Sequence, residues 1–129
     1  MRYLGIDYGE KRIGLAMSDP GALIAFPKKT LLNFKNQRAL EQLKTLITEE
    51  KISGVVVGLP IALDGRYTAE TQKALDFGEM LKKELKLPLE YENEMLTTHF
   101  VEQSGVKKEH TDAAAAAVIL QSYLDKRKK

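Results

Sequence analysis

The chain has 129 residues, a usual size for one domain, of which 43% are hydrophobic and 29% charged. This composition excludes disorder of the whole chain, and the lack of cysteine excludes disulfides, zinc–thiolate sites and thiol nucleophiles. The formal net charge of +2 gives a weak indication of an anionic partner. No apolar run approaches the ~20 residues of a membrane span, and no signal-peptide pattern is present, so we expect a cytoplasmic protein without membrane contact.

The first third of the chain is predicted to form three β-strands. Residues 3–7 and 12–18 have strand patterns and are joined by the short glycine-containing segment 8–11, which is typical of a β-hairpin. Residues 23–30 follow a turn and form the third candidate strand. Within them, Pro27 favours an edge strand or a bulge, because proline cannot donate a hydrogen bond to a sheet.

The middle of the chain alternates between helical and strand patterns. Residues 36–50 place leucine and isoleucine at helical spacing, which predicts an amphipathic helix. The β-branched run at residues 54–58 is typical of a strand buried on both faces. Residues 68–85 predict a second helix, and residues 87–93 predict another strand.

The last part of the chain is predicted to be helical. Thr97 or Thr98 has the chemistry of the N-cap of a short helix that Gly105 ends, and a final helix begins near Thr111. The order of elements is therefore β-β-β-α-β-α-β-α-α. This order implies an α/β fold in which residues 1–129 form one domain, with a five-stranded mixed sheet flanked by helices.

Three acidic residues stand at the ends of predicted elements. Asp7 closes the first strand, Glu94 follows the last strand, and Asp112 lies at the start of an alanine-rich helix. Strand ends are where α/β sheets bind ligands. Taken one at a time, however, each acid also has an ordinary structural explanation. They can be a turn residue, a solvated strand end and a first-turn acid stabilised by the helix dipole.

The sequence around these acids resembles the YqgF (RuvX) family. The resemblance rests on four blocks that occur in the same order and spacing and cover nearly the whole chain. The blocks are Gly5-Ile6-Asp7-Tyr8-Gly9 with Lys11-Arg12-Ile13-Gly14 and Ser18-Asp19; Val57-Gly58-Leu59-Pro60 with Asp64-Gly65 and Phe77; Glu94 with Leu96-Thr97-Thr98; and Asp112-Ala113 with Ala115 and Ile119-Leu120-Gln121-Ser122-Tyr123-Leu124. One block alone would be a weak signal, whereas four ordered blocks are a strong one.

This resemblance implies an RNase H-like fold and a nuclease, an enzyme that hydrolyses phosphodiester bonds. The family is described as processing the 5′ end of pre-16S ribosomal RNA, in ribosome biogenesis, and also as resolving Holliday junctions. Carried over by position, its catalytic and metal-binding acids are Asp7, Glu94 and Asp112. The sequence departs from the family beside the glutamate, where Asn93 and Met95 stand in place of the usual aspartate and arginine.

Phosphodiester hydrolysis explains why such a set of carboxylates is needed. Mg²⁺ prefers oxygen ligands and is usually held by one or two carboxylates together with substrate phosphate. Two ions about 4 Å apart can stabilise the attacking and the leaving oxygen. We therefore expect Mg²⁺ or Mn²⁺, as two ions when substrate is bound, with Asp7 as the bridge between them. Without a cation, clustered carboxylates repel one another, which raises the pKa of at least one of them.

Further residues are candidates for contacts with the nucleic acid. They are, in chain order, Lys11, Arg12, Arg66, Thr97 and Thr98. The three basic residues follow turns, where they either meet phosphates or remain exposed loop residues. The two threonines are typical of a helix cap, and the free N–H groups at such a helix end can also bind phosphate.

Four functions are compatible with these patterns. The favoured one is a metal-dependent endonuclease that acts on structured RNA, and the second is a resolvase of four-way DNA junctions. A resolvase cuts two strands symmetrically and so needs a homodimer, whereas an RNA nuclease can act as a monomer. The change at Asn93 and Met95 motivates a third, a nucleic-acid-binding module without activity. The fourth, a sugar-kinase or actin-like ATPase, needs two such domains around a cleft and ranks last.

Overall fold

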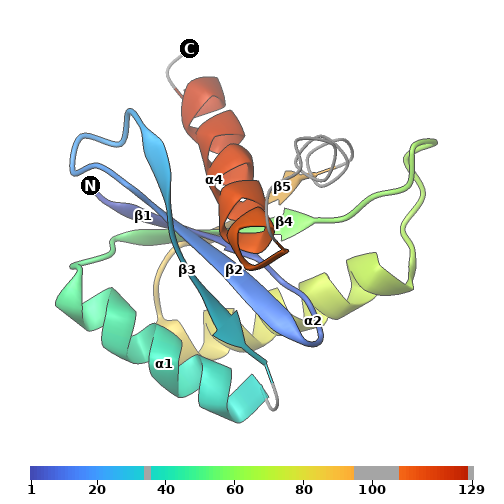
Figure 1. The fold of residues 1–129 in the computed structure, drawn as a ribbon, viewed down its shortest axis with the longest axis horizontal. Coiled ribbons are helices and arrows are strands. Elements are labelled where there is room, and N and C mark those ends of the chain that lie inside the picture. The colour runs from blue at the N-terminus through green and yellow to red at the C-terminus, as the bar shows by residue number, and fades with distance from the viewer. Residues whose placement is uncertain (34–35, 95–107, 128–129) are drawn as a thin grey trace.

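The computed structural model describes residues 1–33, 36–94 and 108–127, within which five strands form one mixed sheet in the order β3-β2-β1-β4-β5 (Figure 1). The strands are β1 (Tyr3–Asp7), β2 (Arg12–Ser18), β3 (Ala25–Leu32), β4 (Gly54–Leu59) and β5 (Leu89–Asn93). The helices in these ranges are α1 (Asn36–Glu49), α2 (Ala69–Leu85) and α4 (Lys108–Arg127). The first three strands pair antiparallel, and β1, β4 and β5 pair parallel, which confirms the predicted hairpin and mixed sheet.

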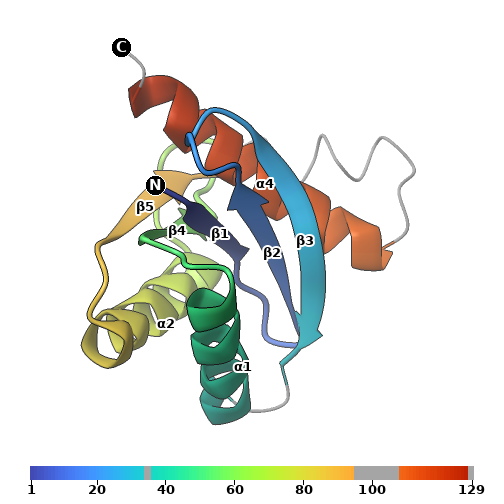
Figure 2. The same ribbon diagram turned by 90° about the vertical axis from the view of Figure 1, so that its left-hand side faces the viewer.

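Helices cover both faces of this sheet (Figure 2). Helices α1 and α2 pack on one face, and α4 crosses the other. Because side chains alternate along a strand, Leu4 and Ile6 of β1 belong to the core under α1 and α2, whereas Tyr3 belongs to the core under α4. Strand β4 is buried along its whole length, as its β-branched run predicts. None of the described helices is long and apolar enough to cross a membrane.

Glycines stand on the face of the sheet where α4 approaches it most closely. A Cβ atom added at Gly5 would lie 2.8 Å from Cβ of Leu120, and one added at Gly58 would lie 2.5 Å from Cδ1 of Ile119. Larger side chains would therefore push the helix away from the sheet. The alanines at the start of α4 have the same effect from the helix side, with Ala116 fully buried. The helix consequently lies directly on the strands.

Strand β3 starts two residues later than the sequence pattern predicts. The carboxylate of Asp19 accepts hydrogen bonds from the backbone N–H groups of Gly21, Leu23 and Ile24, so residues 19–24 form a turn rather than strand. Both expectations for Pro27 are confirmed. Strand β3 is an edge strand, and the β2–β3 register shifts at the position where Pro27 pairs.

Two helix boundaries also bear on the predictions. Thr68 forms the N-cap of α2 in a capping box with Thr71, so the helix predicted over residues 68–85 begins one residue later, at Ala69. The final helix begins at Lys108 rather than near Thr111, so Asp112 lies in its second turn and not in its first. The short helix predicted between Thr97 or Thr98 and Gly105 lies outside the described residues.

Candidate functional site

Charged residues line one end of the sheet on the face that α4 covers. Arg12 begins β2, Asp7 ends β1, and Glu94 directly follows β5. The two-residue period of a strand places Asp7 on the same face as Gly5, against which α4 packs. The backbone N–H of Glu94 donates to the carbonyl of Leu59 at 3.0 Å, which prolongs the β4–β5 pairing by one residue. The predicted gathering of acids at strand ends is therefore present for Asp7 and Glu94.

Asp7 and Glu94 form a coupled carboxyl pair. Asp7 is half-buried and Glu94 is only 5% exposed, and a hydrogen bond joins their carboxyl groups. Burial raises the pKa of Glu94, and the charge of Asp7 and the shared hydrogen bond raise it further. Burial also raises the pKa of Asp7, while the hydrogen bond from Glu94 lowers it. Without a cation, the pair therefore keeps one proton, on Glu94, which it donates to Asp7.

The carboxyl oxygen Oε2 of Glu94 is a candidate ligand for a metal ion. Oε2 is buried and has no hydrogen-bond partner, and it lies over Gly58, 3.2 Å from where a Cβ atom would be. A buried carboxyl oxygen without a partner costs free energy unless a donor or a cation satisfies it. The alternative interpretation of Glu94 as a solvated strand end is therefore wrong. The oxygens of Asp7 and Glu94 have the hard-donor chemistry that a divalent cation such as Mg²⁺ requires.

Asp112 is engaged by an arginine. The Nε atom of Arg12 donates to Oδ2 of Asp112 at 2.7 Å, across 100 residues of sequence. The charge of Asp112 contributes to the raised pKa of Asp7, so the third acid lies near the pair. Within residues 1–33, 36–94 and 108–127, however, no three histidine, aspartate or glutamate side chains gather closely enough to hold a metal ion. The structure thus joins two of the predicted acids and pairs the third with Arg12.

The turn that carries Lys11 and Arg12 is held by Asn33. The side-chain Nδ2 of Asn33 donates to the carbonyl of Gly9 at 2.9 Å, and its backbone N–H donates to the carbonyl of Lys11 at 2.8 Å. A Cβ atom added at Gly9 would lie 2.5 Å from the carbonyl oxygen of Arg12, so the tight turn requires glycine. Sequence reasoning missed Asn33, because no local pattern links it to a turn 24 residues earlier.

A hollow of about 470 Å³ opens beside this turn. Its lining residues are Tyr8, Gly9, Glu10, Lys11, Glu70 and Lys73. Tyr8 stacks on Phe77 of α2 with 4.4 Å between ring centroids, and Lys73 is paired with Glu10. Lys11, one of the predicted phosphate contacts, thus borders an open space beside the turn that follows Asp7.

The other predicted contacts are less informative. Arg66 lies in the exposed loop before α2, where its Nε atom donates to Oδ2 of Asp64 at 2.5 Å within the same loop. Thr97, Thr98 and Met95 lie outside the described residues. Asn93 is an exposed residue at the end of β5, whereas the adjacent Glu94 is buried.

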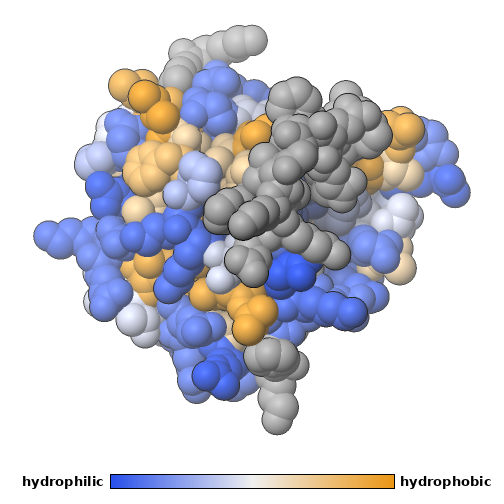
Figure 3. All heavy atoms as spheres, in the orientation of Figure 1, coloured by the Kyte–Doolittle hydropathy of each residue, from blue (hydrophilic) through white to orange (hydrophobic). Residues whose placement is uncertain are grey.

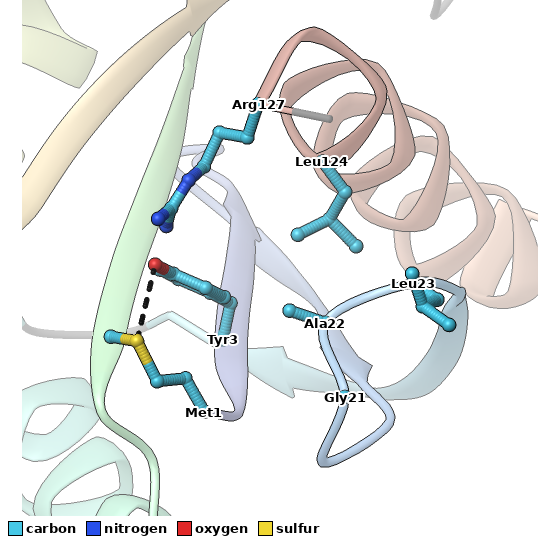
Figure 4. A pocket seen from close by; sticks show the side chains of 7 residues that line it. All are labelled: Met1, Tyr3, Gly21, Ala22, Leu23, Leu124 and Arg127. Atoms are coloured by element: carbon cyan, nitrogen blue, oxygen red, sulfur yellow. Dashed lines mark hydrogen bonds between the residues drawn. The ribbon is translucent and has the colours of Figure 1, made fainter. Parts of the chain in front are cut away.

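The opposite end of β1 carries a different hollow, of about 280 Å³ (Figure 4). Its lining residues are Met1, Tyr3, Gly21, Ala22, Leu23, Leu124 and Arg127, with the guanidinium of Arg127 over the ring of Tyr3 at 5.1 Å. No acid belongs to that lining. In the view of Figure 3, hydrophobic surface is broken into separate patches among hydrophilic residues. The carboxyl pair at the other end of β1 is therefore the stronger candidate for chemistry.

The sequence matches proteins of one family over almost its whole length. The matching family model is RuvX, described as Holliday junction resolvase, and it covers residues 1–126. A protein of Rickettsia felis named "Putative pre-16S rRNA nuclease" is 37% identical, with 98% of this chain and 87% of that protein covered. A protein of the same name from Nitratidesulfovibrio vulgaris is 39% identical, with 97% and 94% covered.

Solved structures support the same fold. A Thermus thermophilus RuvC structure superposes with a TM-score of 0.62 at 18% identity, covering 99% of this chain and 96% of that one. The fowlpox virus resolvase in a complex with Holliday junction DNA superposes with a TM-score of 0.61 at 10% identity, and both chains are fully covered. At these identities the likeness concerns the fold, which is the RNase H-like arrangement that the sequence resemblance implies.

Proposed function

The chain belongs to the RuvX family, and we propose that it is a divalent-metal-dependent endonuclease that acts on structured RNA at the 5′ end of pre-16S rRNA. Family membership and fold together make it a hydrolytic nuclease with an RNase H-like fold. The RNA substrate is proposed from the names of the relatives, which are 37% and 39% identical to this chain. We further propose that residues 1–129 act as one domain and that Mg²⁺ or Mn²⁺ is the cofactor.

One observation supports the metal-dependent chemistry best. The carboxyl groups of Asp7 and Glu94 are buried against each other at a strand end, and Oε2 of Glu94 has no partner. Such an arrangement is unfavourable in a metal-free protein, because both burial and mutual repulsion oppose ionisation. A divalent cation removes both costs, since it replaces the shared proton and satisfies the free oxygen.

The chain's residues then have separate tasks in hydrolysis. A bound divalent ion supplies charge neutralisation at the phosphoryl group and activates water. Asp7 and Glu94 would hold the ion once their shared proton is lost to solvent, and Asp112 would act as a third carboxylate. Lys11 and Arg12, in the turn that Asn33 holds, bind phosphates of the substrate strand. Because the hydrogen bonds of Asn33 fix this turn, the two side chains keep the scissile phosphate oriented toward Asp7.

The proposal is tested by cleavage of labelled RNA. Purified protein is incubated with a segment that spans the 5′ end of pre-16S rRNA and, separately, with a four-way DNA junction, each with Mg²⁺ or Mn²⁺. We expect cleavage of the RNA by the wild type and by Asp76→Asn, but not by Asp7→Asn. Asp76 is an exposed residue of α2, so its substitution makes the same charge change away from the pair. Equal cleavage by Asp7→Asn would overturn the site assignment.

A second candidate function follows from the description of the family model, Holliday junction resolvase. Paired nicks in the four-way junction, with the RNA left intact, would favour it over the RNA nuclease. Resolution also requires two active sites related by symmetry, so the mass of the protein in solution separates the two functions. A protein that stays monomeric with junction DNA bound is not a resolvase.

A non-catalytic binding module would behave differently from both. It would bind nucleic acid with an affinity that falls steeply with salt, but it would cut neither substrate with any divalent metal. The sequence change at Asn93 motivates this alternative, yet Asn93 is exposed at the strand end while Glu94 is buried and paired with Asp7. The change at position 93 therefore leaves the carboxyl pair intact.

A further inference from the structure

Arg12 binds the carboxylate of Asp112, which the proposed metal-dependent chemistry requires. Nε of Arg12 donates to Oδ2 of Asp112 at 2.7 Å, a short charge-assisted hydrogen bond. Among the described residues, Arg12 makes no other hydrogen bond or ion pair that competes with this one. The positive charge of Arg12 therefore already neutralises the carboxylate of Asp112 in the protein without metal.

Both partners are held in place from opposite sides. Arg12 begins β2 directly after the turn that Asn33 fixes, and Asp112 lies in the second turn of α4, whose backbone rests on Gly14 of the same strand. The side chains of Arg12 and Asp112 are 27% and 23% exposed, so solvent and solutes reach the pair. A guanidinium of this exposure can exchange its carboxylate partner for a phosphate without moving the backbone.

We propose that Arg12 is a positioning residue that competes with the divalent cation for Asp112. This inference rests on the proposed metal-dependent function and deepens it. In the protein without metal or nucleic acid, Arg12 holds Asp112 away from Asp7 and Glu94 and lowers the repulsion among the three acids. A substrate phosphate draws the guanidinium off Asp112, which then completes the site. Nucleic acid and metal therefore strengthen each other's binding through Arg12.

The first test follows Arg12 itself by NMR of arginine Nε–Hε groups during a Mg²⁺ titration. We expect the Arg12 signal to move and to exchange faster with solvent as Mg²⁺ saturates the site, because its hydrogen bond to Asp112 breaks. Arg66 is an internal control, since its Nε atom donates to Asp64 in a loop of its own and should not respond. Asp7→Asn should suppress the response of Arg12.

The second test measures Mn²⁺ affinity by calorimetry in the absence of nucleic acid. Arg12→Gln should bind Mn²⁺ about fivefold more tightly than the wild type, the scale of a partly exposed ion pair. Lys29→Gln removes a positive charge from an exposed position on β3 and should leave the affinity unchanged. In an Asp112→Asn background, Arg12→Gln should have no effect, because the competition acts through that carboxylate alone.

The outcomes separate this inference from the proposed function. If Mg²⁺ shifts the backbone signals of Asp7 and Glu94 while Arg12 stays bonded to Asp112, the metal site stands and the competition is wrong. The competition is also wrong if Arg12→Gln tightens Mn²⁺ binding equally with Asp112→Asn present, since a general charge effect then explains the change. If neither the carboxyl pair nor Arg12 responds to saturating metal in any variant, the metal-dependent function itself fails, and the competition with it.

Discussion

The backbone of Asp112 rests on Gly14. A Cβ atom added at Gly14 would lie 1.9 Å from the carbonyl oxygen of Asp112 and 2.3 Å from its carbonyl carbon. These are backbone atoms, so a side chain at position 14 cannot be accommodated by a change of rotamer. The glycine in β2 thereby sets how closely the start of α4 approaches the sheet, and with it the position of Asp112.

Substitution of this glycine should separate folding from activity. Gly14→Ala is expected to displace the start of α4, to lower the free energy of unfolding by about 1–3 kcal/mol, and to reduce cleavage by about 10²-fold, because a shift of about 1 Å misplaces Asp112. Thermal unfolding and cleavage rates measure the two effects. Gly21→Ala, at an exposed turn where the new Cβ would meet side-chain atoms alone, Oδ2 of Asp19 at 3.2 Å and Cγ of Leu23 at 4.0 Å, is the matched control. Wild-type cleavage by Gly14→Ala would contradict a role of Asp112 in the site.

Removal of charge at Asp7 should abolish activity without unfolding the protein. Asp7→Asn keeps the volume of the side chain, but it removes a metal ligand and is expected to lower the cleavage rate by about 10³-fold or more. The melting temperature in EDTA should stay the same or rise, because an amide oxygen can still accept the hydrogen bond that Glu94 donates, and burial no longer opposes a charge at position 7. Rates from single-turnover cleavage and melts from circular dichroism check both parts. A large fall in melting temperature would mean that Asp7 has a structural role instead.

The coupled pair should make stability depend on pH in metal-free protein. Burial raises the pKa of Glu94 above its ordinary value of 4.5, so the folded state binds this proton more tightly than the unfolded state. The resulting stabilisation is fully present below that ordinary value and is lost as pH rises through the raised pKa. We expect the melting temperature of wild type relative to Glu94→Gln to fall as the pH rises from about 4.5 to the raised pKa of about 9.

Divalent metal should reverse this pH dependence. A metal ion binds the ionised carboxylates, so its stabilising effect on the wild type should grow with pH, whereas Glu94→Gln should show little of it. Melting curves with EDTA or with Mg²⁺ at each pH provide the comparison. If wild type and Glu94→Gln lose stability in parallel across this range without metal, the proton is not shared as the geometry indicates.

Lys11 should contribute to the electrostatic part of nucleic-acid binding. It borders the hollow beside the turn that follows Asp7, and loss of one phosphate contact is expected to reduce the slope of log affinity against log salt by about 0.7–0.9. Lys11→Ala and Lys44→Ala are compared by fluorescence anisotropy with labelled RNA and Ca²⁺. Lys44 lies on α1, where it pairs with Glu84 of α2, and it does not border this hollow, so its substitution should leave the slope unchanged. Equal slopes for both variants would exclude Lys11 from the interface.

Much of the fold could be predicted from local patterns. The hairpin of β1 and β2, the buried strand β4 and the amphipathic helix α1 follow from hydrophobic periodicity and turn residues, because those signals act over a few residues. The predicted boundaries were wrong at the starts of β3 and α4. The carboxylate of Asp19 accepts hydrogen bonds that hold residues 19–24 in a turn, so β3 begins later than predicted. Helix α4 begins at Lys108, three residues before the predicted start.

The candidate acids could be named from the sequence, since family-like blocks surround Asp7, Glu94 and Asp112. The protonation and the pairing of these acids could not be predicted from the sequence. The burial of Glu94 and its shared proton with Asp7 depend on β5 pairing with β4 and on α4 lying over Gly58. The pairing of Arg12 with Asp112 depends on contacts across 100 residues. The sequence determined which groups this chain carries. The pairing of β5 with β4 and the docking of α4 on glycines of the sheet decided which of them meet, because only tertiary packing brings distant side chains together.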